Sequence, residues 1–231
     1  MKTKKPQIVP TVMPTDQKDF LEKIDKVFHF VGTIQIDVMD GRFVPSKSWP
    51  YNSPGDDLWE SLVNQDKGLP YWEDINYEVD LMVENQIEEA KNWISAGVMR
   101  VICHIEALKE SDKEDFINLK KEFGVELSLA LVPETPLSEL DPYLEHLDSV
   151  QFMGINKIGY QGQAFEPKVL DKIKEFHEKN PEITISIDGG VSYETAADLF
   201  DAGATRLASG STIFNAVNPK EVIDELKAMA N

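Results

Sequence analysis

The chain has 231 residues, 42% of them hydrophobic, and its 41 acidic and 23 basic residues give a formal net charge of −18. This length suits one α/β barrel domain over residues 1–231, since such barrels commonly form a single unit of about this size. The negative charge disfavours nucleic acid and anionic membranes as partners. A phosphorylated metabolite remains compatible with it, because backbone N–H groups at helix N-termini bind phosphate without basic side chains.

Cysteine content and hydropathy predict a cytoplasmic location and no membrane partner. The single cysteine, Cys103, lies in an apolar segment and has no second cysteine to pair with, which excludes a disulfide framework and favours a reducing compartment. The N-terminal residues lack the apolar segment of a secretion signal. No stretch approaches the about 18 consecutive apolar residues that a membrane span requires.

Apolar segments with polar or glycine-containing tips alternate with amphipathic segments along the chain. The predicted strands are residues 7–13, 34–41, 77–82, 100–105, 126–132, 149–155, 183–188 and 205–209. The predicted helices are residues 19–28, 56–63, 85–96, 112–123, 137–147, 167–179 and 193–201, with a last helical region opening at 210–213. This alternation predicts a (β/α)8 TIM barrel of the phosphate-binding type.

A doubly wound open sheet is the competing fold. Its Gly-x-Gly-x-x-Gly fingerprint is absent after the first predicted strand, which weakens that alternative. Glycines instead follow the last three predicted strands, and in barrels the loops after strands seven and eight commonly bind phosphate. We therefore expect phosphate contacts from Gly189, Gly190, Gly210 and Ser211.

The connection between the second and third strands, residues 42–76, is unusually long and holds three of the four tryptophans. Loops of this size in compact domains tend to be lids or contact surfaces. A lid, a subunit contact and plain surface elaboration all stay open for it.

Three predicted strands carry an aspartate near the C-terminal end: Asp37, Asp80 and Asp188. The C-terminal ends of barrel strands meet at one rim. We therefore expect these three carboxylates to converge.

Taken together, several motifs resemble the ribulose-phosphate 3-epimerase family over nearly the whole chain. They are Pro10-Thr11 and residues 36–45, 81–85, 104–107, 133–136, 159–163, 188–191 and 209–211. The resemblance implies an isomerase that inverts C3 of ribulose 5-phosphate to give xylulose 5-phosphate through an enediolate.

The resemblance also assigns Asp37 and Asp188 as the acid and base on opposite faces of the sugar. One must remove the C3 proton while the other is already protonated. Two carboxylates about 6 Å apart repel by about 3 kcal/mol at an effective dielectric near 20, or about two pKa units, which favours this division.

A divalent metal held by two histidines and two aspartates is a further implication of the resemblance. Gln35 and Asp80 stand where the family has histidines, so the expected ligands become Gln35, Asp37, Asp80 and Asp188. Oxygen ligands favour Mg²⁺ or Mn²⁺. Without a metal, a protonated Asp80 would donate a hydrogen bond to the intermediate. His104, on the fourth strand, corresponds to a family histidine outside the metal set.

Substrate contacts follow from the same resemblance. The family's glycine-rich loop corresponds to residues 159–163, where Gln161 replaces the middle glycine. Besides the phosphate contacts named above, the expected substrate-binding residues are Thr11, Met39, Met82, Met153, Gly159 and Gly162. The three methionines either roof the reacting carbons or simply fill the core.

Other functions stay open. The first is an epimerase of a six-carbon ketose phosphate, and the second is a non-catalytic sugar-phosphate-binding homologue with a degraded metal site. A related decarboxylase or aldolase is less supported, because residues 37–40 read Asp-Val-Met-Asp without the lysine of the Asp-x-Lys-x-x-Asp signature. Since relatives form dimers or hexamers, we expect a homo-oligomer.

Overall fold

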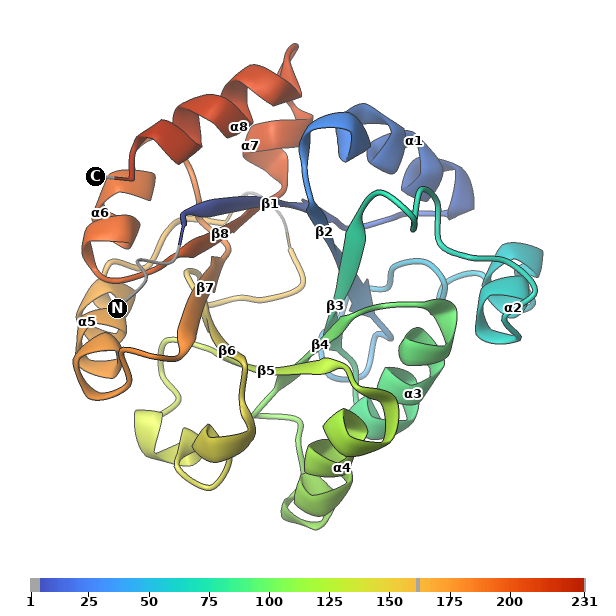
Figure 1. Ribbon diagram of the computed structural model, residues 1–231, viewed down its shortest axis with the longest axis horizontal. Helices are drawn as coiled ribbons and strands as arrows, with labels where there is room; N and C mark the ends of the chain where they lie inside the picture. The colour runs from blue at the N-terminus through green and yellow to red at the C-terminus, as the bar shows by residue number, and fades with distance from the viewer. Residues whose placement is uncertain (1–4, 161–162, 231) are drawn as a thin grey trace.

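In the computed structural model, which describes residues 5–160 and 163–230, eight parallel strands close into a barrel in chain order (Figure 1). The strands are β1 Gln7–Val12, β2 Thr33–Met39, β3 Asn76–Met82, β4 Arg100–His104, β5 Glu126–Leu131, β6 Ser149–Met153, β7 Thr184–Asp188 and β8 Arg206–Ser209. β8 pairs with β1 and completes the ring. The predicted TIM barrel is confirmed.

Helices surround the barrel (Figure 1). They are α1 Gln17–Val27, α2 Asp57–Val63, α3 Gln86–Ala96, α4 Lys113–Phe123, α5 Lys168–Lys179, α6 Ala196–Asp201, α7 Ser211–Phe214 and α8 Pro219–Ala228. Among the described residues, no helix is both long and apolar enough to cross a bilayer.

Local sequence explains several helix ends. The Asp16 side chain accepts a hydrogen bond from the N–H of Asp19 and so caps the start of α1, as short acidic side chains do at helix N-termini. α3 and α4 end at Gly97 and Gly124, whose φ angles are 108° and 72°. Glycine adopts this left-handed conformation without the steric penalty that a Cβ imposes.

The helix predicted over residues 137–147 is wrong. The structure has two short 3₁₀ turns there, Leu137–Leu140 and Leu144–His146. Pro142 lies between them. Proline lacks the N–H that an α-helix needs at this position, and its ring clashes with the carbonyl one turn earlier.

The long connection after β2 is anchored by tryptophans to the outside of the barrel. Trp49 is fully buried, and its ring centroid lies 5.9 Å from that of Trp59 and 6.3 Å from that of Trp93 in α3. The rings of Trp59 and Trp93 are 4.5 Å apart. Trp72 remains 63% exposed. A lid or subunit contact therefore stays a prediction for the exposed part of this connection.

The interior of the barrel is rich in polar side chains. Buried there are Gln35, Asp37, Glu78, Asp80, His104, Ser128, Ser149, Gln151, Ser186, Asp188 and Arg206. Barrels are more often filled with branched apolar residues. Buried polar groups are costly unless they are hydrogen-bonded, so this interior points to a site rather than to packing alone.

Candidate active site

Asp37, Asp80 and Asp188 come together at the C-terminal end of the barrel. One carboxylate oxygen from each lies within 4.8 Å of the others, as the strand order predicts. Asp37 and Asp80 are register partners on β2 and β3. The three residues are only 5%, 0% and 8% exposed, so this acidic cluster is shielded from bulk water.

Gln35 links two of these carboxylates. Its Nε2 donates to Asp37 Oδ1 at 2.9 Å and to Asp188 Oδ2 at 2.8 Å. Its Oε1 is buried and has no hydrogen-bond partner among the described residues. One amide thus holds the two aspartates at a fixed separation and leaves a free oxygen beside them.

Asp80 is held by two residues that the sequence motifs do not assign to the site. Its Oδ1 lies 3.0 Å from His104 Nε2, and its Oδ2 accepts a hydrogen bond from Gln151 Nε2 at 2.9 Å. The resemblance places His104 outside the metal set, and no motif includes Gln151. Gln151 lies two residues before Met153 on β6. Because alternate residues of a strand share one face, the two-residue separation from Met153 predicts that Gln151 also points into the barrel.

Burial and mutual repulsion perturb these acids. Burial raises the pKa of Asp37 well above its ordinary value, and the charges of Asp188 and Asp80 raise it further. Burial, followed by the charge of Asp80, raises the pKa of Asp188 to about 7. Burial lowers the pKa of His104, but Asp80 outweighs this effect and the result is about 9. Near neutral pH, the Asp37–Asp188 pair is therefore suited to hold one proton.

The raised pKa of Asp188 predicts an unusual pH dependence of stability for the metal-free protein. Between the ordinary value of 3.8 and about 7, the unfolded chain ionises this carboxyl while the folded protein keeps it protonated. The folded state then binds more protons, so the free energy of unfolding falls as pH rises, by at most about 1.4 kcal/mol per pH unit. Above pH 7 the loss is complete.

Thermal melts of wild type and Asp188→Asn between pH 4.5 and 7.5 check this expectation. Since other titrating groups are common to both proteins, the variant should gain stability relative to wild type across this window. A difference that is constant with pH would contradict the assignment.

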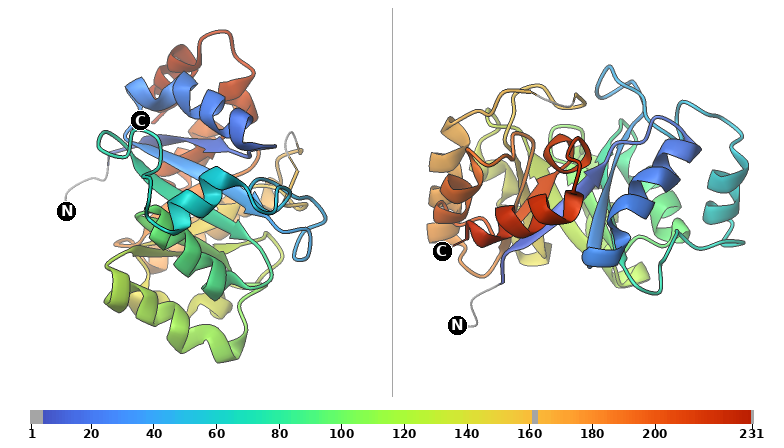
Figure 2. Two further views of the ribbon diagram at one scale, coloured as in Figure 1. Left: turned by 90° about the vertical axis from the view of Figure 1, so that its right-hand side faces the viewer. Right: turned by 90° about the horizontal axis from the view of Figure 1, so that it is seen from above.

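A small cavity opens above Asp37 and Asp188, and Asp80 does not line it. It has a volume of about 60 Å³, and the residues lining it include Thr11, Asp37, Met82, Met153, Gly159, Asp188, Gly189, Gly190, Gly210 and Ser211. The segments after β2 and β6 rise around this end of the barrel, opposite the N-terminus (Figure 2). Most of the predicted substrate-binding residues therefore surround one space.

Two predicted substrate-binding residues do not line this cavity in the described part of the chain. Met39 is buried and packs against Val44 and Met82 instead. Gly162 lies outside the described residues. Three others have backbone conformations that favour glycine: Gly159, Gly189 and Gly190 have φ angles of +86°, +88° and +70°. A Cβ on Gly189 would lie 2.8 Å from Ile155.

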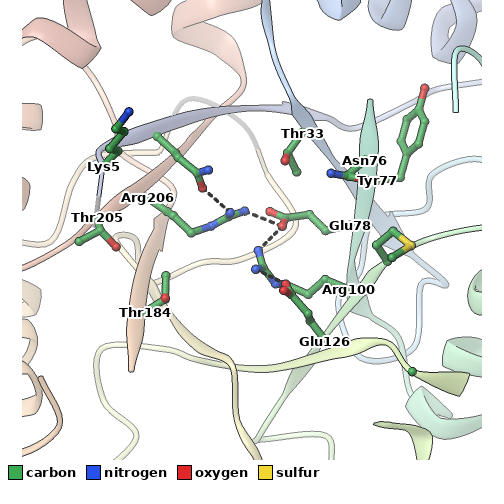
Figure 3. A pocket seen from close by; sticks show the side chains of 13 residues that line it. Lys5, Thr33, Asn76, Tyr77, Glu78, Arg100, Glu126, Thr184, Thr205 and Arg206 are labelled. Atoms are coloured by element: carbon green, nitrogen blue, oxygen red, sulfur yellow. Dashed lines mark hydrogen bonds and ion pairs between the residues drawn. The ribbon is translucent and has the colours of Figure 1, made fainter. Parts of the chain in front are cut away.

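A much larger cavity, of about 590 Å³, lies at the opposite end of the barrel (Figure 3). Two glutamates and two arginines of its lining pair with one another. Arg100 Nη1 and Arg206 Nη2 both donate to Glu78 Oε2, at 2.6 and 2.5 Å, and Arg100 also binds Glu126. The buried charges of this end are paired within the protein, whereas the opposite end brings three buried carboxylates together. We therefore place the candidate active site at the acidic end.

Comparison with known proteins identifies the family of the chain. The model of the ribulose-phosphate 3 epimerase family matches residues 7–214. The ribulose-phosphate 3-epimerase of Buchnera aphidicola is 32% identical over 225 residues, which cover 95% of this chain and 92% of that protein. That of Escherichia coli K12 is 30% identical over 226 residues, covering 96% and 94%. The chain belongs to the ribulose-phosphate 3-epimerase family.

Solved structures with low sequence identity share the fold. KGPDC from Streptococcus mutans has a TM-score of 0.71 at 16% identity, with 97% of each chain covered. The 3-hexulose-6-phosphate synthase of Salmonella typhimurium has a TM-score of 0.69 at 14% identity, covering 97% of this chain and 98% of that chain. Membership of the ribulose-phosphate 3-epimerase family confirms the predicted carbohydrate isomerase, and it supports a small sugar phosphate as substrate.

The residues present fit the divalent metal implied for ribulose-phosphate 3-epimerases. Asp37, Asp80 and Asp188 each offer an oxygen within 4.8 Å of the others. The buried Oε1 of Gln35 has no hydrogen-bond partner among the described residues, which makes it a candidate for a fourth oxygen ligand. Carboxylate and amide oxygens are ligands that hard cations prefer. The cluster could therefore hold a metal ion, although its donors differ from the family's two histidines and two aspartates.

Proposed function

We propose that this protein interconverts D-ribulose 5-phosphate and D-xylulose 5-phosphate by inverting C3. The observation that carries the proposal is the Asp37–Asp188 pair. Both carboxyls are buried, both line the small cavity, and both have raised pKa values. Opposed groups that share one proton are what two-sided proton transfer requires.

In the proposed reaction, the ionised member of the pair removes the proton from C3 and leaves an enediolate. The protonated member then delivers a proton to the opposite face of C3. One carboxyl gains a proton and the other loses one, so the site holds the same number of protons before and after. Gln35, through hydrogen bonds of 2.9 and 2.8 Å to the two aspartates, keeps them apart and oriented.

A single divalent cation, Mg²⁺ or Mn²⁺, is part of the proposal, with Gln35, Asp37, Asp80 and Asp188 as its ligands. When bound there, it supplies positive charge that offsets the three carboxylates and the negative charge developing on the substrate oxygens. The oxygen-only donor set is the reason for preferring a hard ion.

The rest of the substrate would lie along the small cavity. We assign its phosphate to the backbone around Gly189, Gly190, Gly210 and Ser211, all of which line that space. The Thr11 hydroxyl would contact the sugar, and Met82 and Met153 would cover its reacting carbons. Gly159 would contact the substrate from the segment after β6, and Met39 would pack beneath this methionine layer.

Epimerisation of ribulose 5-phosphate by metal-stripped protein tests the proposal, with repeats in Mg²⁺, Mn²⁺, Zn²⁺ and Fe²⁺. We expect activity that depends on the added ion and is highest with Mg²⁺ or Mn²⁺. In deuterated water, deuterium should enter C3 of the product. Activity only on a six-carbon ketose phosphate would replace the proposed substrate. Binding of sugar phosphate without deuterium incorporation under any ion would indicate a non-catalytic homologue.

A further inference from the structure

Asp80 has both of its oxygens occupied by neighbouring side chains. His104 Nε2 lies 3.0 Å from Oδ1, and Gln151 Nε2 donates to Oδ2 at 2.9 Å. These partners come from β4 and β6, on one side of Asp80 in the barrel order. Asp80 is completely buried, so water has no access with which to orient its carboxylate. The plane of that carboxylate is therefore set by these two residues.

His104 is itself held firmly. Its backbone N–H donates to Gln86 Oε1 at 2.5 Å, and Gln86 Nε2 donates to the His104 carbonyl at 2.8 Å. This pair of bonds attaches the last residue of β4 to the first residue of α3. These bonds fix the backbone of His104, and the imidazole itself is held by its contact with Asp80 and its burial. His104 is therefore placed to orient the Asp80 carboxylate rather than to contact a substrate.

The far side of the imidazole is also enclosed. Its Nδ1 lies 3.8 Å from Glu106 Oε2, and Glu106 is fixed by hydrogen bonds from the Val132 N–H at 2.9 Å and from Thr135. The Phe43 ring centroid lies 5.4 Å from that of His104. Neither His104 nor Gln151 lines the small cavity among the described residues. Their contact with the acidic cluster is through Asp80, which does not line the cavity either.

We propose that His104 and Gln151 are positioning residues that hold the Asp80 carboxylate toward Asp37 and Asp188, and so complete the cation site. The proposal rests on the proposed function, because it deepens the role of that same site. Groups that hydrogen-bond to a metal-ligating carboxylate fix its orientation, and their loss typically weakens metal binding by about 10- to 100-fold. Here an aspartate stands where the family has a histidine, and these two residues provide the support that this aspartate needs.

The test is Mn²⁺ affinity of the metal-stripped full chain, measured by calorimetry and by electron paramagnetic resonance, for wild type, His104→Gln, His104→Leu and Gln151→Met. His104→Gln keeps a nitrogen donor, whereas His104→Leu removes it. We expect affinity to decrease from wild type to His104→Gln to His104→Leu, with a loss of about 10- to 100-fold at the end of the series. Gln151→Met, which conserves side-chain length, covers the case in which a His104 variant fails to fold.

The matched control is His29→Gln, at an exposed histidine in the turn after α1, and it should bind Mn²⁺ like wild type. In the positioning variants, kcat should fall while KM changes by less than about twofold, since the proposed phosphate contacts lie in the segments that follow β7 and β8. Wild-type affinity in folded His104→Leu and Gln151→Met would overturn the positioning role. Weakened Mn²⁺ binding in a protein that does not epimerise ribulose 5-phosphate would support positioning and refute only the proposed function. Wild type that binds no Mn²⁺ would overturn the positioning role even if it epimerises.

Discussion

Asp37→Asn and Asp188→Asn are each expected to lower kcat for epimerisation by about 10³-fold or more, because positioned acid–base groups contribute about 10²- to 10⁴-fold each. Asparagine keeps the size of the side chain. It can also still accept the hydrogen bond that Gln35 Nε2 donates to each aspartate. The fold and the cavity should therefore persist, and at saturating Mg²⁺ or Mn²⁺ the loss should reside in proton transfer.

Hydrogen exchange at C3 separates the two carboxylates. A variant that keeps one base can still remove and return the proton on that base's face of the sugar. Each variant should therefore exchange deuterium into C3 of only one of the two epimers, and the two variants should select opposite epimers. The control is Asp171→Asn, on the exposed surface of α5, which should leave both activities unchanged. Exchange into both epimers by either variant would exclude the two-aspartate mechanism.

The barrel and its acidic cluster could be predicted because both follow from local patterns. Each strand is a short apolar segment with polar or glycine residues at its C-terminal end. A parallel barrel brings the C-terminal ends of all its strands to one side. Knowing that Asp37, Asp80 and Asp188 occupy strand ends was therefore enough to expect their convergence. The glycines after β7 and β8 were identifiable for the same reason, since local loop chemistry marks them.

The polar contacts within the barrel could not be predicted from such patterns. Gln35 and Asp188 are 153 residues apart in the sequence, and Gln151 and Asp80 are 71 residues apart. Which side chain reaches which carboxylate depends on the register between strands, and period-two alternation alone does not fix that register. Gln35 was expected only as a metal ligand, whereas its amide nitrogen joins two aspartates. The absence of an α-helix at 137–147 is different, because its cause, Pro142, is a local feature of the sequence.

Glu78→Gln is expected to lower the free energy of unfolding by about 3 to 5 kcal/mol, since removal of one partner of a buried ion pair leaves an uncompensated charge. Glu78 is almost fully buried, and its Oε2 accepts from both Arg100 and Arg206. The neutral amide would leave Arg206 without a carboxylate partner, because its other hydrogen bond is to the neutral side chain of Gln7. Urea denaturation monitored by circular dichroism measures the change.

The control is Glu126→Gln, which removes the other carboxylate that binds Arg100. That side chain is 54% exposed, and exposed pairs contribute about 0 to 1 kcal/mol. A comparable loss in both variants would show that burial does not determine the effect.

A double variant distinguishes two contributions to the free energy of unfolding: the destabilisation by an unpaired buried charge, and the net effect of the buried ion pair. Glu78→Leu with Arg206→Met replaces both charges by apolar groups and leaves Arg100 paired with Glu126 at the rim. Because the desolvation of two buried charges often cancels their attraction, such replacements are often neutral or stabilising. We therefore expect the double variant to be more stable than Glu78→Gln and close to wild type. If the double variant is instead as unstable as Glu78→Gln, the Glu78–Arg206 ion pair makes a net contribution to the stability of the end of the barrel shown in Figure 3.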